Sequence, residues 1–176
     1  MPFTLYDATV AGYLQILPAV IGMLDKAEAH CRENGWADDA LTTARLAPDM
    51  WDFTKQIRAM VIHSADAVDG ALVGEILPGY TDDPADFAAL RALVTHAIAR
   101  LNAITPAAIN ALVGRDARFA FSKYHFDFTA ENYLTSFALP NFYFHTTAAY
   151  SVLRMKGVPV GKGNFLGNLR IKELAQ

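Results

Sequence analysis

The segment from residue 137 to residue 157 carries the side chains of this chain that are best spaced to do chemistry together. It reads FALPNFYFHTTAAYSVLRMKG and places Asn141 and His145 four residues apart. Side chains at this spacing share one face of a helix, and both types can bind a metal ion. The same two residues can instead form a hydrogen-bonded pair within a core. The segment therefore predicts either a metal site or a buried polar pair.

A second histidine, His63, lies in another apolar segment. On a helical wheel it falls close to Gln56, at the border of the apolar stripe, so it could reach inward or outward. A catalytic zinc centre usually takes three protein ligands, and its bound water becomes a nucleophile near neutral pH.

Long apolar stripes predict the helices that position these residues. Apolar side chains recur at three- and four-residue steps, as on helices that face a core. The predicted helices span about 4–34, 48–72, 84–104 and 129–157, with Pro140 as a kink or a break in the last. Thr4 should cap the first helix, and Pro48 suits the first turn of the second. We expect an all-α four-helix bundle, a fold that builds metal and cofactor sites from facing helices.

The remaining segments complete a single domain over residues 1–176. Alternating phenylalanines over 117–128 predict two short strands or an extended flap before the last helices. Residues 36–47 and 74–84 are expected to be loops, and the tail should end in an amphipathic helical stub over 166–174. No internal repeat or linker argues for a second domain.

Composition excludes several classes of function. The net charge is −3 and the chain has no dense run of Lys and Arg, which argues against nucleic-acid binding. Cys31 is the single cysteine, so the chain forms no internal disulfide and no cysteine metal cluster, which suits a cytoplasmic protein. The longest apolar run, Val10 to Leu24, is shorter than the roughly 20 residues of a membrane span. We therefore expect no membrane partner.

Three further features have more modest interpretations. The tail GVPVGKG lacks the spacer and the Ser or Thr of a phosphate-binding loop. His125 could line a pocket mouth or lie at an exposed hairpin tip. His96 shares a face with small alanines, which makes contact in a homodimer as reasonable as chemistry.

Two motifs carry a family resemblance. The run FALPNFYFHTTAAYSVLRMKGVPVGKGNFLG, with RLAPDM at residues 45–50, resembles the bacterial domain-of-unknown-function family 1993 over nearly the whole chain. That family is grouped with the DinB and YfiT-like proteins, which are regarded as metalloenzymes. The resemblance implies a DinB-like four-helix bundle of the up-down-down-up type. It also implies a divalent metal held by one histidine of the second helix and an H-x-x-x-H pair of the last.

Carried onto this chain, the family pattern implies a degraded metal site. The LR-x-x-GV ending aligns His145 with the second histidine of the pair and Asn141 with the first, and His63 lies where the second-helix histidine is expected. An asparagine amide is a much weaker ligand for Zn²⁺ or Ni²⁺ than an imidazole is.

Two functions remain open. The first is a small-ligand-binding or interaction bundle without strong metal binding, present as a homodimer, whose pocket is lined by Asn141, His145, Tyr133 and Phe137. The alternative is a divalent-metal-dependent enzyme of the thiol transferase or hydrolase type that uses His63, Asn141 and His145. The resemblance alone does not choose between them, because one fold hosts many chemistries.

Overall fold

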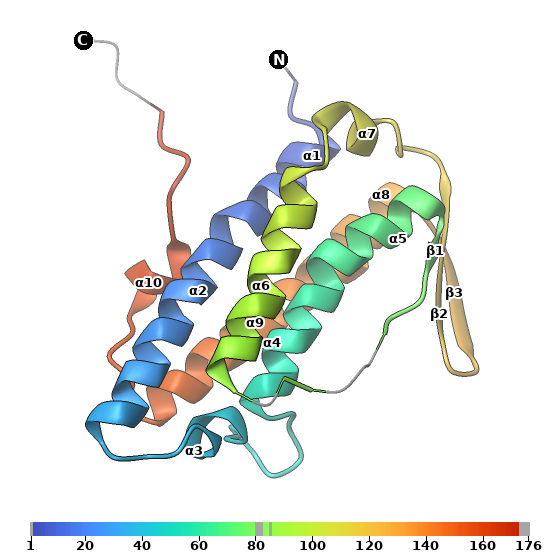
Figure 1. Cartoon of the computed structure of the whole chain (residues 1–176). Helices are drawn as coiled ribbons and strands as arrows, with labels where there is room; N and C mark the ends of the chain where they lie inside the picture. Colours follow the sequence, from blue (N-terminus) through green and yellow to red (C-terminus); the bar gives the residue numbers. More distant parts are fainter. Residues whose placement is uncertain (1, 80–82, 85, 173–176) are drawn as a thin grey trace.

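Four long helical segments lie side by side and form the body of the protein (Figure 1). The structure is a computed structural model that describes residues 2–79, 83–84 and 86–172. The first and third segments are α2 (Val10–Glu33) and α6 (Phe87–Asn102). The second segment is the continuous run α4 (Phe53–Val61), η1 (Ile62–Asp66) and α5 (Ala67–Val73). The fourth is the run α8 (Ala130–Asn132), η2 (Tyr133–Ala138) and α9 (Leu139–Met155). The most extensive helix contacts pair α4 with α9 and α2 with α6.

The predicted first helix is divided in two. A short helix, α1 (Leu5–Ala8), precedes α2. The predicted cap is confirmed: the Thr4 hydroxyl accepts a hydrogen bond from the Asp7 amide at 3.2 Å, and the Asp7 carboxylate accepts one from the Thr4 amide at 3.1 Å. The break falls at Thr9, whose hydroxyl donates to the Leu5 carbonyl at 2.7 Å.

The second helix begins later than predicted, at Phe53 rather than Pro48. Asp52 is its N-cap and accepts a hydrogen bond from the Lys55 amide at 3.0 Å. The side chain of Arg45 donates to the Met50 carbonyl at 3.0 Å and to the Asp52 carboxylate at 3.1 Å. These bonds stabilise residues 45–52 as a loop, so Pro48 does not start the helix. The preceding connection, predicted to be a loop, contains the short helix α3 (Asp39–Thr42).

A small sheet lies along one side of the bundle, next to α5 (Figure 1). Strands β2 (Asp116–Phe121) and β3 (Tyr124–Thr129) form an antiparallel pair, joined at a tight turn where Ser122 has a φ of 56°. A short strand that the sequence did not predict, β1 (Glu75–Ile76), pairs in parallel with β2, so the strand order is β1-β2-β3. The pairing depends on contact between distant segments rather than on a local pattern.

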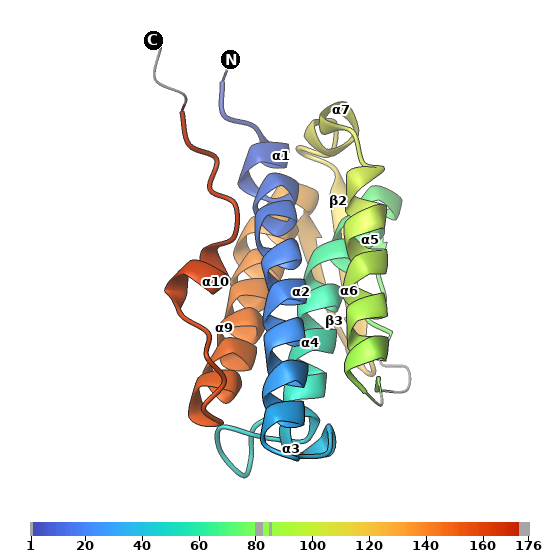
Figure 2. The same cartoon turned by 60° about the vertical axis from the view of Figure 1, so that its left-hand side comes forward.

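The C-terminal part of the chain differs from the prediction. The last long helix ends at Met155, followed by Gly157 at a φ of 80°. The only helix of the described tail is α10 (Lys162–Leu166), which lies against α2, where the Gln15 amide donates to the Leu166 carbonyl at 3.0 Å (Figure 2). Residues 167–172 are not helical, so the predicted stub is wrong there, and its last residues, 173–174, lie outside the described residues. A further short helix, α7 (Pro106–Asn110), follows α6.

The core lies around the second helical segment. All residues from 59 to 65 are buried, as in a helix that is covered on every side. The stretch Leu5–Glu33 is long and apolar enough to cross a membrane, but half of its most apolar window is buried inside the protein. That burial and the packing of α2 on α6 identify it as a core helix of the bundle.

The buried hydroxyl of Tyr13 is expected to lower the stability of the protein. Tyr13 is fully buried, its ring meets Phe142 edge to face at 4.7 Å, and its hydroxyl has no hydrogen-bond partner among the described residues. Burial also raises the pKa of this hydroxyl. Because an unsatisfied buried hydroxyl costs free energy, we expect Tyr13→Phe to raise the free energy of unfolding by about 1 kcal/mol in urea titrations.

The control for this prediction is Tyr124→Phe, because Tyr124 is exposed and should tolerate the change with little effect. A loss of stability in Tyr13→Phe would mean that the hydroxyl is satisfied in solution.

Candidate functional site

Two histidines from different helices meet inside the bundle. His63 lies in η1 and His145 in α9, and their ring centroids are 5.6 Å apart with the rings nearly parallel, at 6°. The residues are only 6% and 7% exposed. The structure thus brings together two of the three predicted metal ligands and turns His63 inward.

A glutamine fixes the protonation of His145. The Nδ1 atom of His145 lies 2.7 Å from Oε1 of Gln56, and Nε2 of Gln56 donates to the Trp51 carbonyl at 3.1 Å. The reverse orientation of the amide would place its oxygen against that carbonyl, so the two bonds together determine the orientation. Since the amide oxygen only accepts, Nδ1 of His145 carries the proton. Nε2 is then the unprotonated nitrogen of the neutral ring and can accept a hydrogen bond.

His63 keeps a polar atom that no neighbour satisfies. Its Nδ1 atom is buried and has no hydrogen-bond partner among the described residues. One apolar neighbour is the ring of Phe137, which it meets edge to face at 5.7 Å. Most buried polar groups in proteins are hydrogen-bonded, so an exception calls for an explanation. Within the described part of the chain, this nitrogen is left to be satisfied by some other group.

Both imidazoles are held in the neutral form. Burial, and to a smaller extent the neighbouring His145, lower the pKa of His63 to about 4. Burial alone lowers the pKa of His145 to about 4. The charged form of each ring is disfavoured because it would lose its hydration. At neutral pH the pair therefore offers lone pairs and N–H groups but no charge.

The histidine pair lies within a series of aromatic rings that runs from Trp51 at the surface to Phe119 of the hairpin. Trp51 stacks on His145 at 5.5 Å, and Phe137 continues from His63 to Phe119 of the hairpin at 4.9 Å. Trp51 is 40% exposed, so the Trp51 end of this series reaches solvent.

An apolar groove lies beside that exposed end. Its volume is about 470 Å³, and it lies between the loop before α4 and the outer side of α9. Phe144, one of its lining residues, meets His145 edge to face at 5.1 Å. The residues that line it are Leu46, Met50, Pro140, Tyr143, Phe144, Thr147, Ala148 and Ser151.

Both helices that carry the site contain a π turn at the site itself. Ser64 of η1 donates to the Met60 carbonyl at 2.8 Å, and Thr135 of η2 donates to the Glu131 carbonyl at 2.6 Å. Pro140 has no amide hydrogen to give to the turn before it. The hydroxyls of Ser64 and Thr135 thus satisfy carbonyls that a widened turn leaves without an amide partner. Such π turns occur often at functional sites.

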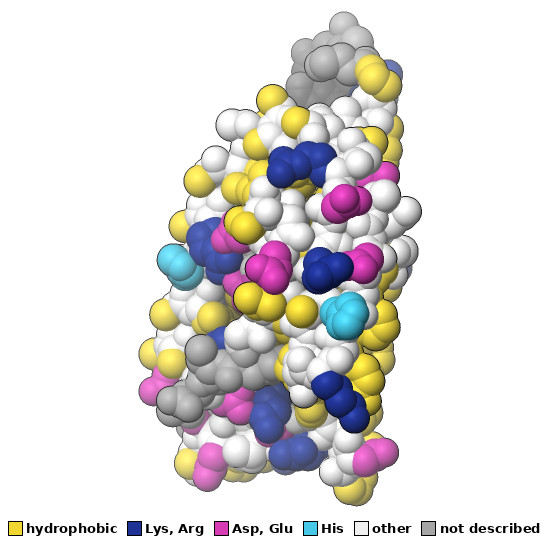
Figure 3. Space-filling view, turned by 90° about the vertical axis from the view of Figure 1, so that its right-hand side faces the viewer, with side chains coloured by type: hydrophobic (Ala, Val, Ile, Leu, Met, Phe, Trp, Pro, Cys, Tyr) yellow, Lys and Arg dark blue, Asp and Glu magenta, His cyan; other side chains and the backbone are white. Residues whose placement is uncertain are grey.

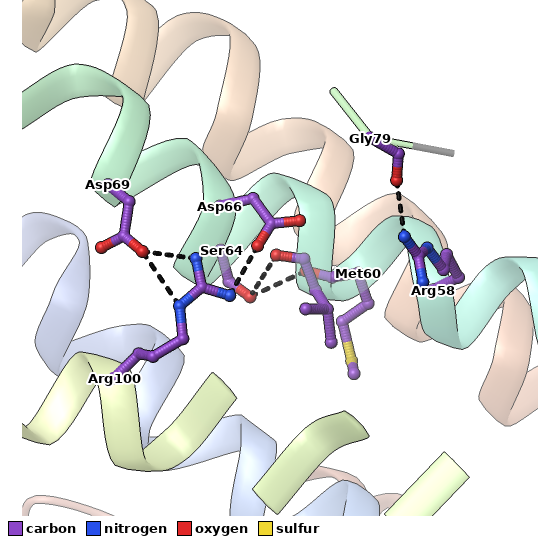
Figure 4. Close-up of polar contacts among 8 residues, drawn as sticks. Arg58, Met60, Ser64, Asp66, Asp69, Gly79 and Arg100 are labelled. Carbon is purple, nitrogen blue, oxygen red and sulfur yellow. Dashed lines mark hydrogen bonds and ion pairs between the residues drawn. The ribbon is translucent and has the colours of Figure 1, made fainter. Parts of the chain in front are cut away.

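An ion cluster on the far side of η1 holds that helix against α6. The guanidinium of Arg100 donates to Asp66 at 2.7 Å and to Asp69 through both Nε and Nη2 (Figure 4). Figure 4 also shows the bond from the Ser64 hydroxyl to the Met60 carbonyl. Because the Arg100 guanidinium binds two carboxylates one turn apart, it fixes the rotation of the helix that carries them about its axis. The same rotation directs His63 inward.

The other predicted site residues lie nearby but do not complete a metal centre. The side-chain amide of Asn141 donates to the Phe137 carbonyl of its own helix at 2.8 Å. Tyr133 is buried and stacks on Phe137 at 5.8 Å. Gln56, which sequence reasoning did not assign to the site, contacts His145 directly. One feature of the sequence could have indicated this role: Gln56 lies two turns before His63 on the same face of the helix.

The donor set does not fit a catalytic metal centre of three strong ligands. Within the described residues no group of three or more His, Cys, Asp and Glu side chains converges. Only two imidazoles meet, and the Nδ1 atom of one of them is bonded to Gln56. The side-chain amide of Asn141 donates its hydrogen bond to a carbonyl of its own helix. Two imidazoles and a weakly binding amide oxygen fall short of the three strong protein ligands that a catalytic zinc ion usually has.

The fold and the site define a class: a helical bundle with a buried pair of neutral imidazoles between two of its helices. The comparisons bear on the family and the fold. Residues 5–166 match the domain-of-unknown-function family DUF1993, and the chain belongs to this family. The crystal structure of a DinB family member from Shewanella denitrificans is similar at 27% identity and a TM-score of 0.80, over 97% of this chain and 96% of that one. No curated protein matches the chain.

Proposed function

We propose that this protein binds a small neutral organic molecule at His63 and His145 and does not bind metal strongly. One observation carries the proposal: two buried imidazoles, neutral at physiological pH, present an unprotonated Nε2 atom on His145 and an unsatisfied Nδ1 atom on His63. A ligand that hydrogen-bonds to both rings would satisfy Nδ1 of His63, which has no hydrogen-bond partner among the described residues.

The chemistry of the site selects the ligand class. Nε2 of His145 accepts a hydrogen bond, so the ligand needs an O–H or N–H donor. A charged ligand would lose its hydration without meeting a counter-charge at the histidine pair. The rings of Trp51 and Phe137 and the adjacent apolar groove favour a molecule with an apolar body.

The proposal includes the cytoplasm as the compartment and the up-down-down-up order of the DinB-like bundle. The course of the chain in Figure 1 supports this order, because α2 and α9 run one way while α4–α5 and α6 run the other. In this arrangement α4 and α9 are neighbours, which is what the His63 and His145 contact requires.

A pair of probes tests the ligand class. Phenol offers an O–H donor on an apolar ring, and toluene has the same shape without the donor. We expect phenol to shift the Cε1–H signals of His63 and His145 in NMR titrations and to bind about tenfold more tightly than toluene, the ratio that one buried hydrogen bond gives. The variant His125→Asn, which alters an exposed histidine, should bind phenol like the wild type. Equal binding of the two probes, or no shift at either histidine, would contradict the proposal.

Metal content separates this function from the alternative. Protein purified without an affinity tag and incubated with Zn²⁺ or Ni²⁺ should retain far less than one equivalent after gel filtration. Near-stoichiometric metal that disappears in His145→Ala would instead favour a metal-dependent enzyme of the thiol transferase or hydrolase type.

A further inference from the structure

Strand β3 forms an exposed edge of the sheet. In the strand order β1-β2-β3 it pairs with β2 alone. Tyr124 and Phe126 are 56% and 50% exposed although both are large aromatic side chains. The strand holds no proline and no lysine, the residues that commonly protect an exposed edge against pairing.

The hydrogen bonds of the hairpin determine which backbone groups point outward. The Ala130 amide donates to the Arg115 carbonyl at 2.7 Å, in register with the β2 and β3 pairs that follow. In an antiparallel pair, hydrogen-bonded positions alternate with non-bonded ones. The even-numbered residues of β3 therefore bond to β2. The amide and carbonyl groups of His125 and Asp127 point to the open edge.

We propose that two copies of this chain associate by pairing their β3 strands in antiparallel fashion about a two-fold axis at Phe126. In this register the bonded pairs are His125 with Asp127 of the second copy and the reverse, which are the positions whose backbone groups point outward. Phe126 faces Phe126 of the second copy, and Tyr124 faces Phe128. A two-fold interface of this kind is self-complementary by construction.

The side chains match in this register. On one face aromatic rings lie opposite aromatic rings, a favourable cross-strand pairing. On the other face each His125 lies opposite Asp127 of the second copy, so no two carboxylates face each other. The Asp127 carboxylate also accepts hydrogen bonds from Arg118 of its own hairpin at 2.6 and 3.2 Å. Figure 3 shows charges of both signs interspersed with apolar side chains on the side of the molecule that carries the hairpin. A second copy would thus meet no field of like charge there.

Cysteine crosslinking tests the register. Residues that face each other across a non-bonded antiparallel pair have Cα atoms about 4.5 Å apart, within disulfide range. Phe126→Cys should therefore oxidise to a disulfide-linked dimer on non-reducing gels. Tyr124→Cys is the matched control, because its two copies would lie about 14 Å apart along the strands. The natural Cys31 is buried and should not interfere.

Sedimentation of the full chain tests the association itself, without a disulfide. We expect a dimer at micromolar concentration for the wild type and at least a tenfold weaker dimer for His125→Pro, which removes an outward amide and leaves the bonds to β2 intact. The control at His96 cannot be a proline, because His96→Pro would break α6. A matched pair of charge changes, His96→Asp and His125→Asp, is compared instead. The first should leave the dimer unchanged, and the second should weaken it.

Three results would overturn the inference. They are a monomeric wild type at 100 micromolar, equal crosslinking of Phe126→Cys and Tyr124→Cys, and a dimer that His125→Pro and His125→Asp leave intact. The last result would place the interface elsewhere, for example on the α6 face that carries His96.

Discussion

Acidification from pH 6.5 to pH 4 is expected to destabilise this protein through His63 and His145. The ordinary histidine pKa of 6.5 applies to the unfolded chain, whereas burial lowers the pKa of both groups to about 4 in the folded protein. Between these values the unfolded state binds more protons, so the free energy of unfolding falls as the pH falls. Above pH 6.5 both states are neutral and the contribution is constant.

The slope of this dependence can be stated in advance. Each histidine contributes up to about 1.4 kcal/mol per pH unit between the two pKa values. Because some solvent reaches His145, we expect a total loss on the order of 3 kcal/mol for the pair. Urea unfolding at a series of pH values measures it, and the carboxylates make their own contribution mainly below pH 5.

Two variants separate the histidine pair from the rest of the chain. The double variant His63→Gln/His145→Gln should show a flatter pH dependence between 6.5 and 5, and the control His125→Asn should keep the wild-type slope. If the double variant does not fold, NMR titration of the wild type decides directly. Cε1–H signals of His63 and His145 that titrate near pH 6.5 would disprove the buried neutral pair.

The sequence predicts the helices well and the site only in part. The apolar stripes of the long helices are local patterns, and a helix with one apolar face has few other ways to bury it. The inward direction of His63 is not such a pattern. A helical wheel assumes 3.6 residues per turn, and the π turn Ile62–Asp66 adds a residue to the turn that carries this histidine.

The contacts that define the site join distant segments. Gln56 and His145 are 89 residues apart in the chain, so their hydrogen bond has no local signature. The stacking of Trp51 on His145 depends on a loop shaped by Arg45 and Asp52. Asn141, singled out by its spacing from His145, instead bonds to its own helix, because a widened turn beside Pro140 leaves carbonyls to satisfy.

Replacement of Gln56 by leucine is expected to be one of the most costly single changes in the protein. The side chain is 2% exposed, and it accepts from His145 and donates to the Trp51 carbonyl. Leucine has a similar size but would leave the buried Nδ1–H of His145 without an acceptor. We expect Gln56→Leu to lower the free energy of unfolding by about 2–3 kcal/mol in urea titrations.

The control is Gln15→Leu. Gln15 also makes a hydrogen bond to a carbonyl, that of Leu166, but it is only half-buried and leaves no buried donor behind. Its loss should cost less than about 1 kcal/mol. Equal costs for the two variants would mean that Gln56 acts only as a filler of space.

Gln56→Glu tests why a neutral amide stands at this position. A carboxylate would accept the same hydrogen bond from Nδ1 of His145 but would also favour the charged imidazolium, because an opposite charge at hydrogen-bond distance raises a histidine pKa. We expect the pKa of His145 to rise by about 2 units or more in NMR titrations, while the pKa of His63 falls further beside a charged neighbour. Phenol binding should weaken near neutral pH, because protonation of His145 removes the lone pair on Nε2. If instead both histidines kept their wild-type titrations, Gln56 would not control the protonation of the pair. A charged pair that still bound phenol as tightly as the wild type would exclude the Nε2 lone pair as the acceptor.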